Sequence, residues 1–443
     1  MNKNMNKKGA IMKKGRNWGW IFGMVSVLML LKTPSINGEE SKDFLSKFHP
    51  YITVTEEYSD NINLTATNKK SDFITTVNAG LMFSALSEKT YGIDLNVAAG
   101  YVYYARDHKR DYSSPSGTLN AWYKVAPTLT FRVTDDFIRS DAAREQDYSP
   151  NALQGQYLLS TERGKAIYIR NVFSPSLEYQ FGKENSFSLN YRNNFYENQS
   201  RRYEDSKENY INPRLTYWFD IRNGISLEYG LTFGDFERSP DFVGHTATGR
   251  YTYRFNPRTS IFGEYTQNWY NFENPSENPS NDYVVYRPSV GISHALTSTL
   301  SGSAQAGYYW KNANGGADSS GPYYNLSLTQ RAQKTTYTVS FQGGYTEDYF
   351  TAENLGFSKY YRVLGSINHQ LMPKVTTGLF SSFEWAKSDG EKDRIWNIGA
   401  NVSYQVLKWL SASLRFSHRA NHSNNDLNDY SEYRGIFSLT ASF

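Results

Sequence analysis

The 443-residue sequence contains no cysteine. The chain can therefore form no disulfide, no thiolate metal site, no CxxCH haem attachment and no lipid-modified N-terminal cysteine. Whatever compartment the protein occupies, only noncovalent interactions hold its fold together.

Long apolar runs are the second absence. Hydrophobic residues make up 39% of the chain, and after residue 38 no run reaches the length of about 20 residues that a membrane-spanning helix requires. Aromatic residues are nevertheless frequent, at 16% of the chain with 36 tyrosines. A membrane β-barrel explains this contrast, because only every second strand residue meets lipid and aromatic residues gather at the membrane interfaces.

Signatures of catalysis are the third absence. The seven histidines form no HExxH pair, and the sequence has no GxSxG nucleophile, P-loop or glycine-rich dinucleotide motif. His418 and His422 lie four residues apart, but on a strand that spacing separates them by roughly 13 Å, too far for one metal ion. We therefore expect no enzyme activity, no catalytic residue, no metal site and no cofactor.

The first 38 residues differ from the rest of the chain. Six basic residues lead into an apolar run at 18–31, and a stretch rich in Pro, Ser and Asn follows. This order is typical of a cleaved secretory signal peptide, and a short buried N-terminal helix is the alternative. We assign residues 1–38 to a signal peptide and residues 39–49 to a short periplasmic segment.

Removal of the signal peptide changes the charge of the chain. Residues 1–38 hold seven of the 47 Lys and Arg residues and none of the 43 acidic ones, so the mature chain would carry a formal charge of −3. The basic pI of the whole sequence is thus no argument for nucleic-acid binding, and we expect no nucleic-acid partner.

Strict alternation of apolar and polar residues dominates the remainder. The final segment carries an apolar face made of Tyr433, Gly435, Phe437, Leu439, Ala441 and Phe443. In the segment 336–346 the apolar face consists of Tyr337, Val339, Phe341, Gly343 and Tyr345. A period of two residues is that of a β-strand with two chemically different faces.

A hairpin repeats from residue 50 to the end of the chain. Nine short polar turns, such as Ala126-Pro127 and Met372-Pro373, separate ten hairpins, each closed by a longer connection such as 140–162 or 388–392. We predict a single all-β domain over residues 50–443. It would be a transmembrane, antiparallel, up-and-down barrel of about 20 strands (18–22), with short periplasmic turns and longer extracellular loops. A soluble β-sandwich or propeller is the alternative.

Twelve charged residues fall on the polar face of these strands. Arg or Lys on the lipid side near the midplane costs about 2–4 kcal/mol, so we assign the twelve to the lumen. Two roles stay open: a lattice of salt bridges that stiffens the wall, or the lining of a wet channel that mildly favours anions or sugar groups. The candidates are Asp94, Arg132, Glu178, Arg192, Arg214, Glu228, Arg250, Glu264, Arg287, Arg362, Arg415 and Arg434.

The longest loop, 140–162, is the third external one. By analogy with general porins this loop would fold inward and narrow the pore, and an ordinary exposed loop is the alternative. The candidate constriction residues are Asp141, Arg144, Glu145, Asp147 and Tyr148.

The last strand resembles the closing strand of bacterial outer-membrane proteins. In those proteins a terminal aromatic residue is recognised by the barrel-insertion machinery. The resemblance implies the same role here for Phe437, Leu439 and Phe443.

The first hairpin carries a second resemblance. It opens with Glu56-Glu57-Tyr58-Ser59-Asp60-Asn61 and returns through 70–81, which begins Lys-Ser-Asp-Phe-Ile-Thr. These segments resemble the opening strands of the family called putative β-barrel porin type 2, with Ala79 where that family usually has proline. The resemblance implies an outer-membrane barrel of a kind often linked to exopolysaccharide export, and it brings no catalytic residues.

We therefore expect an integral protein of the bacterial outer membrane that acts as a passive conduit for exported polysaccharide. A diffusion porin for small solutes, or a structural or adhesive surface barrel, is the alternative. The expected partners are outer-membrane lipid and lipopolysaccharide, the barrel-insertion machinery and periplasmic polysaccharide-export components.

Overall fold

The computed structural model describes residues 46–87, 90–141, 166–201, 203–273, 281–350, 356–388 and 390–443. The expected signal peptide, 1–38, lies outside these residues, as does most of the segment 39–49, so both assignments stay predictions. The unit from His49 to Phe443 is a β-barrel.

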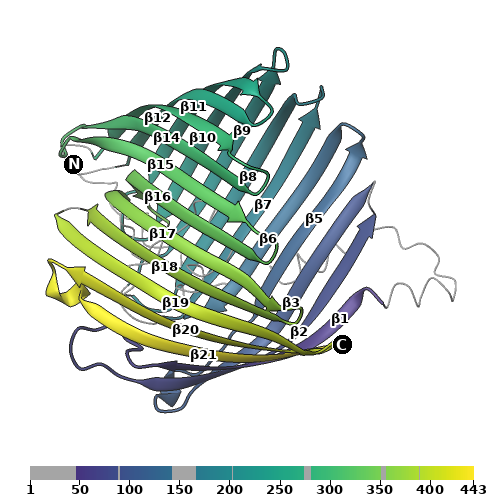
Figure 1. The fold of residues 1–443 in the computed structure, drawn as a ribbon. Coiled ribbons are helices and arrows are strands. Elements are labelled where there is room, and N and C mark those ends of the chain that lie inside the picture. Colours follow the sequence, from purple (N-terminus) through teal and green to yellow (C-terminus); the bar gives the residue numbers. More distant parts are fainter. Residues whose placement is uncertain are drawn as a thin grey trace, which may run out of the picture. The chain divides into compact units, whose positions relative to one another are not determined.

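The barrel wall is made of strands, and two 3-10 helices lie in the described connections (Figure 1). No helix in these parts of the chain is long and apolar enough to cross a membrane. The strands are β1 (Phe48–Ser59), β2 (Asp72–Ser87), β3 (Tyr91–Tyr104), β4 (Tyr112–Ser113), β5 (Ser116–Ala126), β6 (Leu129–Ser140), β7 (Tyr168–Gln180), β8 (Ser186–Asn198), β9 (Ser206–Trp218), β10 (Asn223–Phe236), β11 (Phe242–Asn256), β12 (Thr259–Phe272), β13 (Tyr283–Ala295), β14 (Leu300–Ala313), β15 (Ser319–Arg331), β16 (Thr335–Asp348), β17 (Gly356–Met372), β18 (Val375–Ser388), β19 (Glu391–Leu407), β20 (Leu410–Ser423) and β21 (Tyr430–Ser442). The 3-10 helices are η1 (His108–Arg110) and η4 (Asp426–Asn428).

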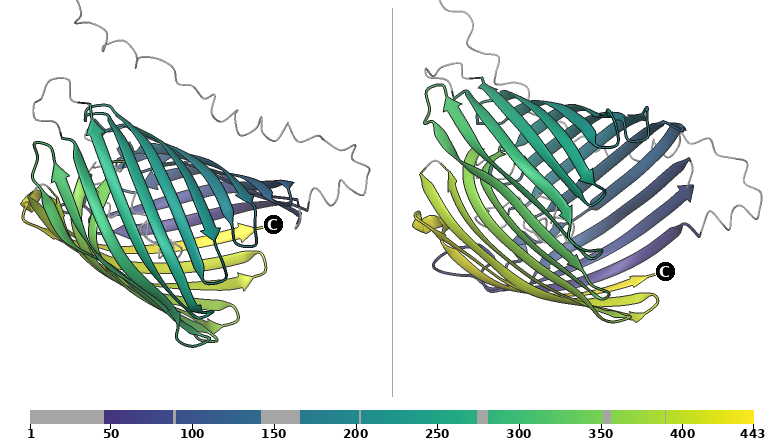
Figure 2. Two further views of the ribbon diagram at one scale, coloured as in Figure 1. Left: turned by 90° about the horizontal axis from the view of Figure 1, so that it is seen from above. Right: turned by 45° about the horizontal axis from the view of Figure 1, so that its top comes forward.

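The strands close into one antiparallel barrel. Each wall strand pairs with the next along the chain, and β1 pairs with β21 from Tyr51 opposite Ser442 to Ser59 opposite Arg434. Figure 2 shows these two strands side by side. The short strand β4 extends the wall position of β5 along β3, so the wall has 20 positions. The predicted 20-strand barrel is confirmed.

The two faces of the wall have the chemistry that the alternation predicts. On β16, Val339 and Phe341 expose 40% and 44% of their surface, whereas Ser340 between them exposes 5%. Across the barrel the exposed large hydrophobic residues keep this phase, and we call the opposite, polar side the inner face. The apolar outer face suits lipid.

The two ends of the barrel differ in their connections. At the turn end, where β1 begins and the chain ends, two to five residues join consecutive strands. The connections at the loop end are mostly longer. The predicted loop 388–392 is wrong, because β18 and β19 extend to Ser388 and Glu391 and leave only two residues between them. Gly390, with φ +88, supplies the backbone conformation that such a tight turn needs.

One strand leaves the wall near the loop end. Pairing between β15 and β16 stops at Tyr324 opposite Gly343, while β16 stays paired with β17 as far as Asp348. Gly344 has φ +150, a backbone conformation that residues other than glycine rarely adopt, and the Tyr324 ring packs closely over Gly343. The prediction that Tyr345 continues the outer face is wrong, because the bend carries it onto the inner side of β14.

Candidate functional site: the two ends of the lumen

A repeated hydrogen bond organises the loop end. An aspartate immediately before a strand accepts from the backbone N–H at the end of the preceding strand: Asp241 from Phe236 at 2.8 Å, and Asp282 from Phe272 at 2.7 Å. The carboxylate thus satisfies a donor that has left the ladder. The same bond is made by Asp111, Asp205, Asp241, Asp282, Asp318 and Asp429.

The residue after such an aspartate is often a buried aromatic. Tyr112, Phe242, Tyr283 and Tyr430 each begin a strand in this way and expose at most 6% of their surface. All lie on the inner face, so the aspartates place a series of rings just inside the loop end. All three hydrophobic clusters of the described residues lie at this end.

The largest of these, which we call the aromatic cluster, covers the inner face of β10–β14. Its wall residues are Phe236, Phe242, Tyr270, Phe272, Tyr283 and Tyr309. The bent end of the β16–β17 hairpin contributes Tyr345, Tyr349, Phe350 and Phe357.

Contacts across several strands fix the hairpin end inside the barrel. The Tyr345 ring lies 4.8 Å from the Tyr309 ring of β14, and the Tyr349 hydroxyl lies 2.6 Å from that of Tyr283 on β13. Asn268 of β12 donates to Glu347 at 2.7 Å. Because these partners lie on the inner face, the hairpin end forms a second layer that narrows the lumen at the loop end.

Hydroxyl groups replace aromatic rings toward the turn end. Directly paired inner residues of successive strands form two rows, which we call the serine row and the seam row. The serine row crosses β12 to β16 through Ser260, Ser293, Ser303, Ser327 and Ser340. The seam row crosses β18 to β21 and β1 through Thr376, Ser403, Ser413, Ser438 and Thr55.

The structure groups some of the twelve predicted charges into ion pairs. Arg250 donates to Glu264 at 2.8 Å, and Arg287 reaches the other oxygen of Glu264 at 3.4 Å. The other predicted arginines with a carboxylate partner pair with residues that the sequence did not nominate. These pairs are Arg192 with Glu208, Arg362 with Glu384, and Arg434 with Glu57.

The remaining predicted charges lie on the inner face in other settings. Asp94 accepts from Ser84, and Glu228 accepts from Asn212 although Arg214 stands opposite it in register. In the described parts of the chain no carboxylate lies within ion-pair distance of Arg132 or Arg214, and no cation lies within that distance of Glu178. All three side chains are exposed. Arg415 follows Leu414, which faces outward, so Arg415 lies on the inner face of β20. Whether these twelve residues line a conducting passage stays a prediction.

The opening motif of the first hairpin lies at the seam where the barrel closes. Glu57 pairs with Arg434 of β21, and both side chains are at most 9% exposed. Ser59 donates to Glu432 at 2.6 Å, and the Asn61 amide donates to the Ser431 carbonyl at 3.0 Å. These residues therefore hold the first strand against the last.

The other candidate segments are only partly described. Asp141 is buried and accepts from the hydroxyls of Tyr104 and Tyr112, which ties the start of the predicted constriction loop to the loop end. Arg144, Glu145, Asp147 and Tyr148 lie outside the described residues. Phe437, Leu439 and Phe443 are exposed on the outer face, and their role in insertion stays a prediction.

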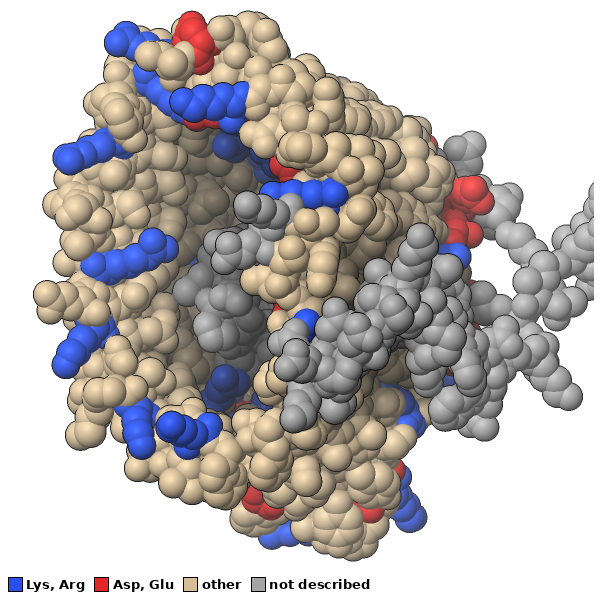
Figure 3. All heavy atoms as spheres, turned by 90° about the vertical axis from the view of Figure 1, so that its right-hand side faces the viewer, with Lys and Arg blue, Asp and Glu red and all other residues tan. Residues whose placement is uncertain are grey.

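The turn end is basic. Its described turns hold two acids, Glu184 and Asp220, against the cations Lys183, Arg222, Arg258, Lys334, Lys374 and Lys408. Glu184 pairs with Arg254 of β11 at 2.6 Å, and hydrogen bonds led by the Asn223 side chain hold the pKa of Asp220 below its usual range. Figure 3 looks at this side of the barrel and shows Lys and Arg side chains around the rim of a hollow.

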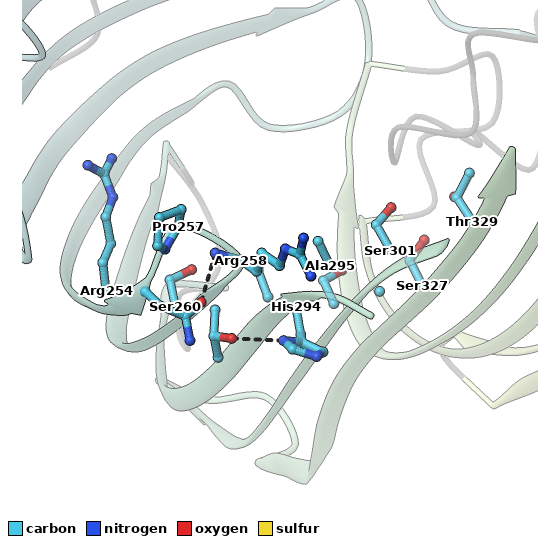
Figure 4. A pocket seen from close by; sticks show the side chains of 14 residues that line it. Arg254, Pro257, Arg258, Ser260, His294, Ala295, Ser301, Ser327 and Thr329 are labelled. Atoms are coloured by element: carbon cyan, nitrogen blue, oxygen red, sulfur yellow. Dashed lines mark hydrogen bonds between the residues drawn. The ribbon is translucent and has the colours of Figure 1, made fainter. Parts of the chain in front are cut away.

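A pocket of about 410 Å³ lies beside this rim, where β11 to β15 reach the turn end (Figure 4). Its polar lining includes Arg254, Asn256, Arg258 and His294, together with the hydroxyls of Ser260, Ser293 and Ser327 of the serine row. The volume is within the range of about 300–1,000 Å³ seen for small-molecule sites.

A family model described as "Putative beta-barrel porin 2" matches residues 230–443. Over these residues the chain is similar to this family. The matched part begins within β10, so this match and the resemblance of the first hairpin rest on different parts of the chain. No curated protein matches the sequence.

Several solved structures are similar to this chain. The outer membrane protein opdK from Pseudomonas aeruginosa is similar over 90% of this chain and 100% of its own, with 10% identity and a TM-score of 0.44. The siderophore receptor PirA from Pseudomonas aeruginosa is similar over 90% and 80%, with 10% identity and a TM-score of 0.48. The ferric citrate transporter FecA is similar over 90% and 79%, with 11% identity and a TM-score of 0.48.

The match to this porin family and the closed barrel together support an outer-membrane β-barrel channel of the porin type. In the described parts of the barrel no group of three His, Asp or Glu residues can hold a metal ion.

Sequence reasoning missed three features of the lumen. The aspartate caps had a usable signal, since an aspartate directly before an aromatic strand start recurs at Asp111, Asp241, Asp282 and Asp429. The hydroxyl rows and the partners Glu57, Glu208 and Glu384 had none, because they depend on which residues of neighbouring strands stand opposite each other.

Proposed function

We propose that this barrel is a passive conduit for polysaccharide leaving the periplasm. The observation that carries the proposal is the pair of hydroxyl rows, which cover ten strands of the turn-end half of the lumen. Neighbouring strands lie about 4.8 Å apart, so each row offers a hydroxyl at that interval to the hydroxyls of a sugar chain.

The polymer would enter at the turn end, which faces the periplasm in barrels of this type. Periplasmic polysaccharide-export components would deliver it there. Hydroxyls suit this role because each can both donate and accept, so a sliding chain exchanges hydrogen bonds without a deep energy minimum. The resemblance of the first hairpin to barrels linked to exopolysaccharide export supports the same conclusion.

The test compares two substitutions on neighbouring residues of β14. Ser303→Phe fills the serine row, whereas Ala304→Phe places the same ring on the outer face, where lipid accommodates it. Cells that lack the protein, and cells that carry Ser303→Phe, should lose surface polysaccharide by capsule or biofilm staining. Ala304→Phe should restore it. Unaltered polysaccharide in the deletion strain would rule out the export role.

A diffusion porin for small solutes is the second candidate. The aromatic cluster favours it, because the tucked hairpin leaves less room for a polymer at the loop end. Under this alternative the purified protein should give large, stable, weakly selective steps in planar bilayers. Ser303→Phe should then reduce those steps while surface polysaccharide stays normal.

A further inference from the structure

The charges of the connections have opposite signs at the two ends of the barrel. The described turns hold six basic and two acidic residues, whereas the described loops hold seven basic and thirteen acidic ones. The basic turns attract an anion to the turn end, and the acidic loops repel it at the loop end.

Within the turn-end pocket, Arg258 is the cation that remains available. Arg254 also lines the pocket, but its guanidinium pairs with Glu184 and lies 3.4 Å from the centre of the Trp218 ring. No described carboxylate lies within ion-pair distance of Arg258, which is exposed. Figure 4 shows its side chain reaching from the β11–β12 turn toward Ala295 on the pocket side.

An acidic sugar needs a cation for its carboxylate and polar groups for its ring hydroxyls, and both kinds of group lie around Arg258. The serine row begins beside it, with Ser260 opposite Ser293 and Ser293 opposite Ser303. Arg331 stands on the inner face of β15 two residues from Thr329, which also lines the pocket. A carboxylate could pair with a guanidinium through two parallel hydrogen bonds while the ring hydroxyls contact the serines.

We infer that this pocket binds a carboxylate-bearing sugar residue and selects acidic glycan chains at the periplasmic mouth. The inference rests on the proposed export function and adds the class of substrate. The same cations could instead bind the phosphate groups of inner-leaflet lipid, which offer a similar charge. That source is distinguished by measuring in bilayers with and without anionic lipid.

The experiment measures how oligosaccharides interrupt the current through the purified barrel in a bilayer of zwitterionic lipid. Oligogalacturonate should block at a concentration about tenfold or more below that of a malto-oligosaccharide of equal length, as expected for a charge-assisted contact. The preference should shrink between 0.1 M and 1 M salt, because the screening length falls from about 10 Å to about 3 Å.

Three charge-removing variants locate the effect. Arg258→Gln should bring oligogalacturonate block close to that of the neutral sugar, because it removes the cation of the pocket. Arg222→Gln, in the next turn of the same rim, should weaken the block only slightly. Lys109→Gln, in η1 at the loop end, should leave it unchanged.

The outcomes separate this inference from the proposed function. Equal block by both sugars, or an unchanged preference in Arg258→Gln, would overturn the acidic-sugar site and leave the conduit standing. Absence of block by either sugar would count against the conduit itself. A preference that disappears when anionic lipid is added would assign the pocket cations to lipid headgroups and overturn the inference.

Discussion

The two ends of the lumen are built from the same strands and differ in chemistry. Strand β14 shows the difference within one element: Ser301 and Ser303 line the pocket near the turn end, and Tyr309 is 1% exposed in the aromatic cluster near the loop end. Alternation therefore determines which face of the wall a residue occupies, and its distance along the strand determines whether the inner face there is hydroxyl-rich or aromatic.

Size explains the contrast. Serine and glycine leave room for solvent, whereas each aromatic side chain can bury about 150–250 Å² and draws neighbouring rings together. The loop end can thus pack a second layer inside the wall, whereas the described residues at the turn end surround a hollow (Figure 3). We expect recognition at the turn end and resistance to passage at the loop end.

The largest expected effect is on stability, and it compares an ion pair near the loop end, Arg434 with Glu57, with one at the turn end, Arg254 with Glu184. Arg434→Ala should lower the free energy of unfolding by about 3–5 kcal/mol, because it breaks the buried ion pair between Arg434 and Glu57. Arg254→Ala should cost at most about 1 kcal/mol, since the side chains of Arg254 and Glu184 are 34% and 48% exposed. Urea unfolding of the detergent-solubilised barrel, followed by its electrophoretic mobility without heating, measures both. Equal costs would show that the seam is no better packed than the rim.

The next effect concerns passage through the loop end. Tyr309→Ala removes the ring on which Tyr345 and Phe357 pack, so the hairpin end should loosen and single-channel conductance should rise several-fold. Tyr308→Ala is the matched control, because that neighbouring ring is 40% exposed on the outer face. Planar-bilayer recording compares the two variants. An unchanged conductance in Tyr309→Ala would mean that the aromatic cluster does not limit passage.

Much of the fold could be predicted from the sequence because a barrel wall repeats one local rule. The period of two identifies strands and their faces, and turn residues such as Pro373 mark the short connections. The bend at Gly343-Gly344 escaped this rule, because alternation describes a strand only while it stays in the sheet. Once β16 leaves β15, the face that would meet lipid meets the inner wall instead.

The candidate site was harder to predict because it depends on register. Glu57 and Arg434 lie at opposite ends of the chain, and only the pairing of β1 with β21 makes them partners. The serine row likewise consists of residues that look ordinary one strand at a time. Charges could be assigned to a face from the sequence, but their partners could not.

The smallest perturbation tests access to each end directly. The chain has no cysteine, so a single introduced thiol reacts without background. In proteoliposomes Ser327→Cys, in the turn-end pocket, should react quickly with a charged maleimide, and Leu328→Cys, on the lipid side, should not. Tyr283→Cys should react much more slowly than Ser327→Cys, because the position is 4% exposed within the aromatic cluster. If the two inner thiols reacted equally fast, the loop end would be as open as the turn end, and the ends would differ in side-chain chemistry alone.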